Sequence, residues 1–129
     1  MPDKIKVLLV EDDPITQNLI KAFLRRSGNF SVLVTGTIKE AKAVLKKNSD
    51  IQAIIFDGQL IGENTLGMIK EVSDSDFSGH MIAISANTEP GGMHEQQIRA
   101  GCNESCLCKP PLSKLVELME RLTFPRPQA

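Results

Sequence analysis

The sequence predicts an α/β domain in which a doubly wound, mostly parallel sheet of five strands is covered by helices on both faces. Short apolar runs alternate with segments whose apolar residues recur at helical spacing, and this βα pair occurs five times. Most of the runs are rich in Val, Ile and Leu, as strands buried on both faces are. The length of 129 residues suits one compact domain. We therefore expect that domain over residues 1–124, followed by a flexible tail or the start of a linker over residues 125–129.

The first βα unit is bounded by residues with clear local roles. Ile5–Val10 is the first predicted strand, and it stops at a run of three acidic residues. Asp13 followed by Pro14 predicts a helix start, because an aspartate side chain caps the first turn and proline fits the first helical position. Residues 27–29, Ser-Gly-Asn, are expected to end that helix, since glycine favours the left-handed conformation that closes a helix.

The second and third units follow the same order. Phe30–Val34 is the second predicted strand, and Thr37 is expected to cap a helix with one apolar face. Ile51–Phe56 is the third predicted strand and stops at an aspartate. We expect a loop over Gly58–Glu63 and a short helix over Leu66–Val72.

The last two units are shorter and carry weaker signals. Met81–Ile84 is the fourth predicted strand, and a polar, turn-rich segment separates it from a weak helix over Met93–Ala100. Ser105–Cys108 is predicted as the fifth strand. Ser113 is expected to cap the last helix, which carries apolar residues at helical spacing.

The composition argues against several functions and locations. The formal net charge of -1 gives no general attraction to nucleic acid or anionic membranes, and no apolar run reaches the roughly 20 residues of a membrane span. The chain has no Trp or Tyr to stack on bases. Met1–Lys4 lacks the pattern of a signal peptide, and the cysteines at 102, 106 and 108 are a poor disulfide framework. We therefore expect a cytoplasmic protein.

Four of the five predicted strands end on residues that could serve one site. The first strand ends on Glu11 and Asp12, the third on Asp57, the fourth on Ser85 and the fifth on Lys109. In an open α/β sheet, the ligand crevice lies outside the carboxyl ends of the strands. The topology is therefore expected to gather three carboxylates, a hydroxyl and an ammonium group at one edge.

These residue types suit phosphoryl chemistry with Mg²⁺. Carboxylates a few Å apart repel one another, so the cluster needs a cation or a retained proton. Mg²⁺ binds carboxylates, water and phosphate oxygens, and the cluster lacks the His and Cys of a zinc site. Asp57 could attack phosphorus and form an aspartyl phosphate, while Mg²⁺ and Lys109 stabilise the transferring charge. Ser85 could donate a hydrogen bond to a phosphoryl oxygen.

The order and separation of these motifs resemble the receiver domain of two-component response regulators, the CheY-like family. The resemblance rests on the motif Leu9–Pro14, on Asp57 at the end of an apolar strand, on Ser85-Ala86 and on Lys109-Pro110. It extends over residues 4–122. It implies a flavodoxin-like (βα)5 fold with strand order 2-1-3-4-5.

The resemblance also implies a site and its partners. Asp57 would take a phosphoryl group from a phosphohistidine on a sensor histidine kinase or a histidine phosphotransfer protein. Asp12, Asp57 and the backbone carbonyl of Gln59 would bind Mg²⁺ directly, and Glu11 would bind it through water. The fourth helix, fifth strand and fifth helix would form the readout surface for a downstream protein partner or output domain. This is the behaviour of a signalling switch in a phosphorelay and not of an enzyme.

Two positions depart from the family pattern. Leu60–Gly62 stands where many receivers have a proline soon after the phosphorylated aspartate, and Cys106 is nearest to the usual aromatic position on the fifth strand. Phosphorylation of Asp57 does not depend on these two positions. The usual coupling to the readout surface does depend on the aromatic residue that Cys106 replaces. An alternative function is therefore a docking or scaffold module that never takes phosphate.

Three further alternatives are open from the residues alone. A Mg²⁺-dependent phosphatase would pass phosphate through Asp57, but such an enzyme usually needs a second acid as general base, and Gln59 cannot serve as one. The three cysteines could hold structural zinc, but the only candidate for a fourth ligand is His94, which has no support. We therefore prefer to interpret the cysteines as small buried residues. The chain could also be the receiver piece of a longer regulator or hybrid kinase.

Overall fold

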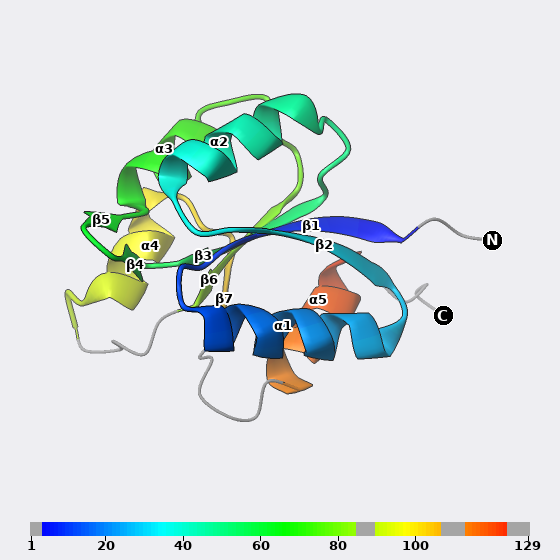
Figure 1. Cartoon of the computed structure of the whole chain (residues 1–129). Coiled ribbons are helices and arrows are strands. Elements are labelled where there is room, and N and C mark those ends of the chain that lie inside the picture. The colour runs from blue at the N-terminus through cyan, green and yellow to red at the C-terminus, as the bar shows by residue number, and fades with distance from the viewer. Residues whose placement is uncertain (1–3, 85–89, 107–112, 124–129) are drawn as a thin grey trace, which may run out of the picture.

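The computed structural model describes residues 4–84, 90–106 and 113–123, which form a parallel sheet between two layers of helices (Figure 1). The strands of the sheet are β1 (Ile5–Val10), β2 (Phe30–Thr35), β3 (Ala53–Asp57), β6 (His80–Ile84) and β7 (Glu104–Cys106). Their spatial order is β2-β1-β3-β6-β7, and each neighbouring pair is parallel. This is the order 2-1-3-4-5 of the sheet strands along the chain, so the α/β fold predicted from the sequence is confirmed.

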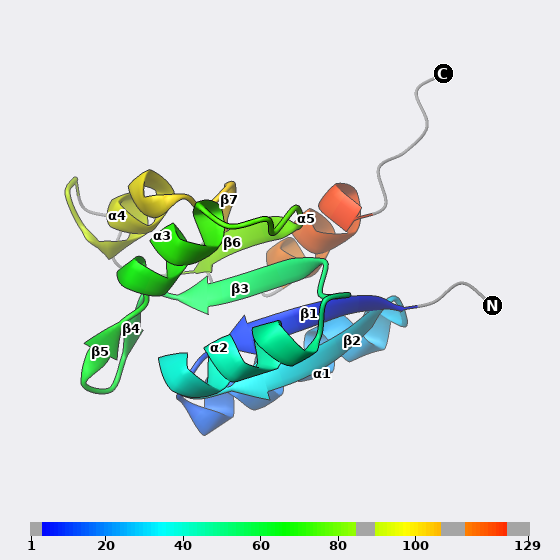
Figure 2. The same ribbon diagram turned by 90° about the horizontal axis from the view of Figure 1, so that it is seen from above.

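Helices cover both faces of this sheet (Figures 1 and 2). One face carries α1 (Pro14–Ser27) and α5 (Ser113–Thr123), and the other carries α2 (Ile38–Lys47), α3 (Leu66–Ser73) and α4 (Met93–Ala100). None of the helices in the described ranges is long and apolar enough to cross a membrane.

The alternation of side chains along each strand divides the core into two halves. Leu9 and Ile55 are fully buried and belong to the cluster that also contains Leu24 of α1 and residues of α5. Leu8 and Ile54, one position earlier on the same strands, are fully buried in the cluster that contains residues of α2 and α3. Both faces of the central strands are therefore apolar, which explains why these strands have the sequence of continuous hydrophobic runs.

The predicted helix ends are confirmed in α1 and α2. An Oδ2 atom of Asp13 accepts a hydrogen bond of 3.0 Å from the backbone N–H of Thr16. Gly28 closes α1 with a φ of 79°, a left-handed conformation that glycine adopts at little cost. The Oγ1 of Thr37 accepts a 3.1 Å hydrogen bond from the N–H of Glu40 at the start of α2.

The segment after Asp57 differs from the loop predicted for it. It contains two short strands, β4 (Gln59–Leu60) and β5 (Glu63–Asn64), which pair antiparallel with Leu60 opposite Glu63. Gly62 has a φ of 76° and lies between them, which allows a tight turn. Strands of two residues are too short to show an alternating pattern in the sequence, so the prediction of an irregular loop was wrong.

Smaller differences concern the last strand and helix. β7 is Glu104–Cys106, whereas the sequence placed the fifth strand at Ser105–Cys108, and positions 107 and 108 lie outside the described residues. Ser113 is the first residue of α5 and not the residue before it. The predicted tail, residues 125–129, also lies outside the described residues.

Replacing Thr37 by alanine should lower the free energy of unfolding by about 1 kcal/mol, because the N–H of Glu40 loses its side-chain acceptor. Urea denaturation followed by circular dichroism measures this change. Thr37→Ser keeps the hydroxyl and should stay within about 0.5 kcal/mol of the wild type. An equal loss of stability in both variants would contradict the capping role.

Candidate functional site

Three carboxylates meet at the carboxyl edge of the sheet. β1 and β3 are parallel neighbours (Figure 2). In their register, Val10 at the end of β1 lies opposite Phe56 of β3. Glu11 therefore follows one strand where Asp57 ends the next, and Asp12 comes immediately afterwards. One oxygen from each of the three side chains lies within 4.8 Å of the other two.

The electrostatics of this cluster centre on Glu11. Its side chain is only 4% exposed, whereas Asp12 and Asp57 are partly exposed. Burial, a hydrogen bond with Asp57 and the negative charges of Asp57 and Asp12 raise the pKa of Glu11 to about 9. The N–H of Asp13, 3.3 Å from Glu11 Oε1, works in the opposite direction. Without a cation, Glu11 therefore retains a proton at neutral pH.

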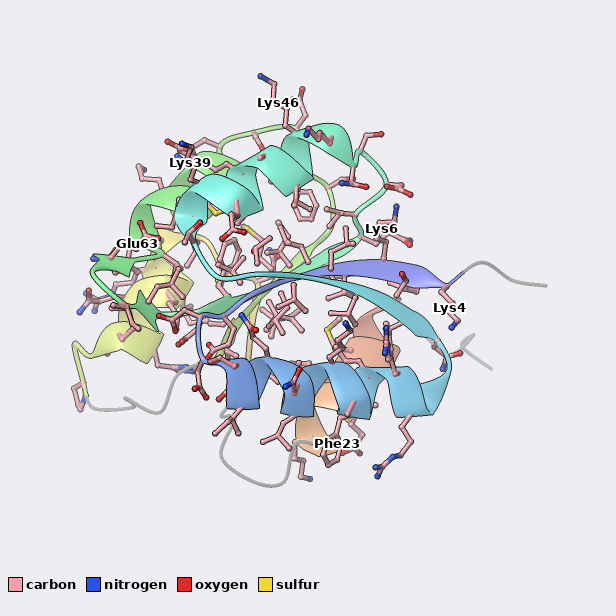
Figure 3. All side chains as sticks on the ribbon, viewed as in Figure 1. Lys4, Lys6, Phe23, Lys39, Lys46 and Glu63 are labelled. Carbon is pink, nitrogen blue, oxygen red and sulfur yellow. The ribbon has the colours of Figure 1, made fainter. Side chains whose placement is uncertain are left out.

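The β4–β5 hairpin lies directly beside the acids. The N–H of Ile61, at the tip of the hairpin, donates a 2.5 Å hydrogen bond to Asp12 Oδ2. Gln59, whose backbone carbonyl was expected to bind Mg²⁺, opens β4 two residues after Asp57. Glu63 points from β5 toward the start of α2, where its Oε1 accepts a 2.9 Å hydrogen bond from Ile38 N–H (Figure 3). The hairpin is thus tied both to the acidic cluster and to a helix.

Buried polar residues hold the backbone around Asp57 from two sides. Thr65, at the start of α3, donates its hydroxyl to the Asp57 carbonyl at 2.7 Å, and its N–H donates to the Gly58 carbonyl at 3.2 Å. Gln97 of α4 donates its Nε2 to the Phe56 carbonyl at 2.9 Å. Both Thr65 and Gln97 are fully buried. Three successive carbonyls around Asp57 therefore accept hydrogen bonds from elements outside the sheet.

A similar arrangement supports the end of β1. The hydroxyl of Thr35 donates to the Leu9 carbonyl at 3.3 Å, and the Thr35 carbonyl accepts the Glu11 N–H at 3.0 Å. Gln17 of α1 donates its Nε2 to the Glu11 carbonyl. Sequence reasoning missed these supporting residues, because an isolated Thr or Gln has no motif. The one usable signal was a polar residue at a position where the apolar face of a strand or helix was expected.

The structure gives less information on Ser85 and Lys109, and it gives Asp13 a local role. Ser85 and Lys109 lie outside the described residues, although Ile84, the residue before Ser85, lies opposite Asp57 in the β3–β6 register. Asp13 acts as a helix cap, and its hydrogen bonds with Thr16 lower its carboxyl pKa. Ser85 and Lys109 therefore stay predictions, while Asp13 has a local structural role.

The cysteines do not add a second metal centre within the described part of the chain. Cys102 is buried, and desolvation raises the pKa of its thiol to about 12, so the reactive thiolate is disfavoured. The side chains of Cys106 and Cys108 lie outside the described residues. Among the residues that are described, the one group of three or more side chains placed to hold a metal is the acidic cluster.

The donor chemistry of this cluster fits a hard divalent cation. Its side chains offer carboxylate oxygens and no nitrogen or sulfur, which is the preference of Mg²⁺ and not of zinc. Two of the carboxylates remain partly exposed, so water and a phosphate oxygen could reach a cation held there. A cation here would also remove the reason for the raised pKa of Glu11, since it favours the ionised carboxyl group.

Comparisons with a family model and with known sequences point to the same family. The family model described as the response regulator receiver domain matches residues 7–122. A chemotaxis protein CheY homolog of Campylobacter jejuni is 33% identical over 101 residues, which cover 77% of each chain. The transcriptional regulatory protein AruR of Pseudomonas aeruginosa is 27% identical over 88 residues, which cover 65% of this chain and 36% of AruR.

Solved structures share the fold. The receiver domain of a sensor histidine kinase from Pseudomonas aeruginosa PAO1, with a magnesium ion in its active-site cleft, is similar with a TM-score of 0.82 and 24% identity. The alignment covers 93% of this chain and 98% of that one. The chemotaxis protein CheY4 of Vibrio cholerae is similar with a TM-score of 0.81 and 18% identity, over 93% and 99% of the two chains.

The raised pKa of Glu11 predicts an unusual pH dependence of stability in the absence of divalent cations. Between about pH 4.5 and pH 9, the folded state keeps a proton on Glu11 that the unfolded chain has lost. This contribution to the free energy of unfolding is therefore fully present below pH 4.5 and is lost as the pH rises toward 9. Glu11→Gln should remove it, so that the variant loses less stability than the wild type over this range.

Urea denaturation in EDTA at a series of pH values measures this effect. Glu71→Gln, at an exposed acid of α3, is the matched control and should keep the wild-type pH dependence. Saturating Mg²⁺ should stabilise the wild type most at the alkaline end, where Glu11 is easiest to ionise. A Glu11→Gln variant with the wild-type pH dependence would show that Glu11 does not hold the proton.

Proposed function

This chain belongs to the response regulator receiver domain family, and from that premise we propose that Asp57 accepts a phosphoryl group from a phosphohistidine donor. The observation that carries the proposal is the meeting of Glu11, Asp12 and Asp57 within 4.8 Å at the carboxyl edge of the sheet. An isolated acid at that edge would be an ordinary surface residue. Three acids placed together, one of them buried, form a site that must hold either a proton or a cation, and a cation is what phosphoryl transfer would use.

In the proposed step, a carboxylate oxygen of Asp57 attacks the phosphorus of the donor. The new O–P bond forms as the P–N bond to the donor imidazole breaks, and the imidazole leaves and takes up a proton. The hydrogen bonds from Thr65 to the carbonyls of Asp57 and Gly58 help to hold Asp57 in place for in-line attack. The product is an aspartyl phosphate, which carries about two negative charges where the free carboxylate carried one.

We propose Mg²⁺ as the cation, bound by Asp12, Asp57 and the backbone carbonyl of Gln59, with Glu11 acting through water. When bound, it neutralises the carboxylates and the charge on the transferring phosphoryl oxygens. The partial exposure of Asp12 and Asp57 leaves room for these additional ligands. Glu11 would contribute from a buried position, where a bound cation would favour its ionised form.

Ser85 and Lys109 are proposed to complete the site. Lys109 would pair with a phosphoryl oxygen, and Ser85 would donate a hydrogen bond to another once the group is attached. Such new contacts can shift the domain between two conformations, and a downstream protein partner or output domain would read the shift. This is the behaviour of a cytoplasmic signalling switch. Each molecule is modified once and then acts through its changed conformation, whereas an enzyme would turn over its substrate repeatedly.

Exposed apolar side chains around the acids favour a protein as the phosphoryl donor. Ile15 and Leu19 lie one turn apart on α1 and are 71% and 48% exposed, and Ile61 at the tip of the hairpin is 91% exposed. Ile15 lies in the first turn of α1, directly after the acidic cluster, and Leu19 lies one turn further along the helix, while the N–H of Ile61 bonds to Asp12. Apolar groups beside a charged site add little to the binding of a small phosphate compound, whereas they can be buried against a protein.

Incubation with Mg²⁺ and acetyl phosphate should add one phosphoryl group to the wild type, measured as intact mass. Asp57→Asn should abolish the gain, because the attacking carboxylate is absent. Asp76→Asn, at an exposed acid away from the cluster, should be phosphorylated like the wild type. EDTA should suppress the gain in the wild type and in Asp76→Asn.

Repeated turnover of the small donor without a stable adduct would favour a phosphatase instead. No gain in a folded wild-type protein that binds Mg²⁺, either from acetyl phosphate or from a panel of autophosphorylated histidine kinases, would contradict the proposal. That result would leave the docking or scaffold module as the function.

Replacing Ile15 and Leu19 together by alanine should separate the two kinds of donor. Transfer from the most efficient histidine kinase of such a panel should slow by at least about tenfold, because two apolar contacts at the interface are lost. Phosphorylation by acetyl phosphate should stay within about twofold of the wild type, since the acids are untouched. Ile98→Ala, at an exposed apolar residue of α4, is the control, and an equal slowing there would contradict this docking face.

A further inference from the structure

α4 packs unusually closely against the residue that follows Asp57. A Cβ atom added to Gly58 would lie 2.1 Å from Cγ of Met93 and 3.2 Å from Cδ of Gln97. A larger residue at position 58 would therefore displace the side chain of Met93 and crowd that of Gln97. The absence of a side chain at Gly58 is what allows the two side chains of α4 to reach the backbone of the acceptor strand.

Gln97 uses this space to place a primary amide in the core. The residue is fully buried, and its Nε2 donates the 2.9 Å hydrogen bond to the carbonyl of Phe56, the residue before Asp57. Its Oε1 is also buried, and within the described part of the chain it accepts no hydrogen bond. A buried amide with one polar atom unpaired is unfavourable for stability, and an apolar side chain of the same length would avoid that cost.

The hydrogen bond from Gln97 to Phe56 links α4 directly to β3, the strand that ends at Asp57. Thr65 holds the carbonyls of Asp57 and Gly58 from the start of α3, whereas Gln97 holds the carbonyl of Phe56 from α4. A shift of α4 therefore pulls on one side of the Asp57 residue while the other side stays anchored. Conversely, a displacement of Asp57 changes the acceptor to which Gln97 is bonded.

We propose that Gln97 is a positioning residue for Asp57, and that its hydrogen bond to the Phe56 carbonyl couples the position of α4 to the position of the acceptor. The proposal rests on the proposed function, since it assumes that Asp57 is the acceptor. Cys106 is the residue nearest to the usual aromatic position on the fifth strand, so this chain lacks the usual aromatic coupling. The buried amide of Gln97 would link Asp57 to α4 instead. The space for this link comes from Gly58.

Gln97→Met tests the proposal, because methionine fills a similar volume without a donor. The maximal rate of Asp57 phosphorylation by acetyl phosphate should fall by roughly tenfold, while the half-saturating donor concentration and the Mg²⁺ dissociation constant stay within about twofold. Mg²⁺ with beryllofluoride, a mimic of the phosphoryl group, should change the exchange rates of the α4 backbone amides in the wild type. In Gln97→Met this response should be lost.

Gln96→Met is the matched control. Gln96 is the neighbouring residue on the same helix, and its Nε2 also bonds to a backbone carbonyl, that of Gly91, at 2.8 Å, but on the exposed side. This variant should keep the wild-type rate and the α4 response. Val72→Ala, a core change in α3, should lower stability and leave the phosphorylation rate unchanged, which separates positioning from general destabilisation.

The outcomes distinguish this proposal from the proposed function. A wild type that is phosphorylated, with Gln97→Met behaving as Gln96→Met does, overturns the positioning role alone. A wild type that is never phosphorylated on Asp57 overturns both. If Gln97→Met does not fold, the side-chain amide resonance of Gln97 in the wild type decides: it should shift on addition of Mg²⁺ and beryllofluoride more than that of Gln96, and an unshifted resonance overturns the proposal.

Discussion

The mutual repulsion of three carboxylates is the constraint on which the rest of this structure depends. Glu11, Asp12 and Asp57 come within 4.8 Å of one another, and burial of Glu11 removes the water that would screen their charges. A proton on Glu11, reflected in its pKa of about 9, is one answer to this repulsion, and a divalent cation is the other. A domain organised around stability alone would not place these groups together.

The polar side chains buried in the described part of the chain are arranged to hold this unfavourable cluster. Besides Glu11 itself, they are Thr35, Thr65 and Gln97, and each bonds to the backbone at or near the residues that carry the acids. Their hydrogen bonds satisfy carbonyls where the strands end and the regular ladder stops. The acids are therefore attached to a stiff backbone, so a cation or phosphoryl group that reaches the site meets carboxylates that are already in position.

The surroundings of the acids differ on their two sides. Toward α1 and the hairpin, the surface carries exposed apolar residues such as Ile15 and Ile61, which suits the approach of another protein. Toward α4, the contacts are buried and close, because Gly58 lets Met93 and Gln97 reach β3. One side is thus open to a partner and the other is packed against the core, with β3 between them.

The sequence by itself determined the βα order, the helix caps at Asp13 and Thr37, and which acids end strands, because these features depend on local periodicity and on residues near one another in the chain. Only the tertiary structure decided the hairpin after Asp57 and the contacts of Gln97. A pair of two-residue strands has no periodicity to detect. A buried amide that bonds to a strand 41 positions away has no local signature, because its role is created by the packing of α4 against Gly58.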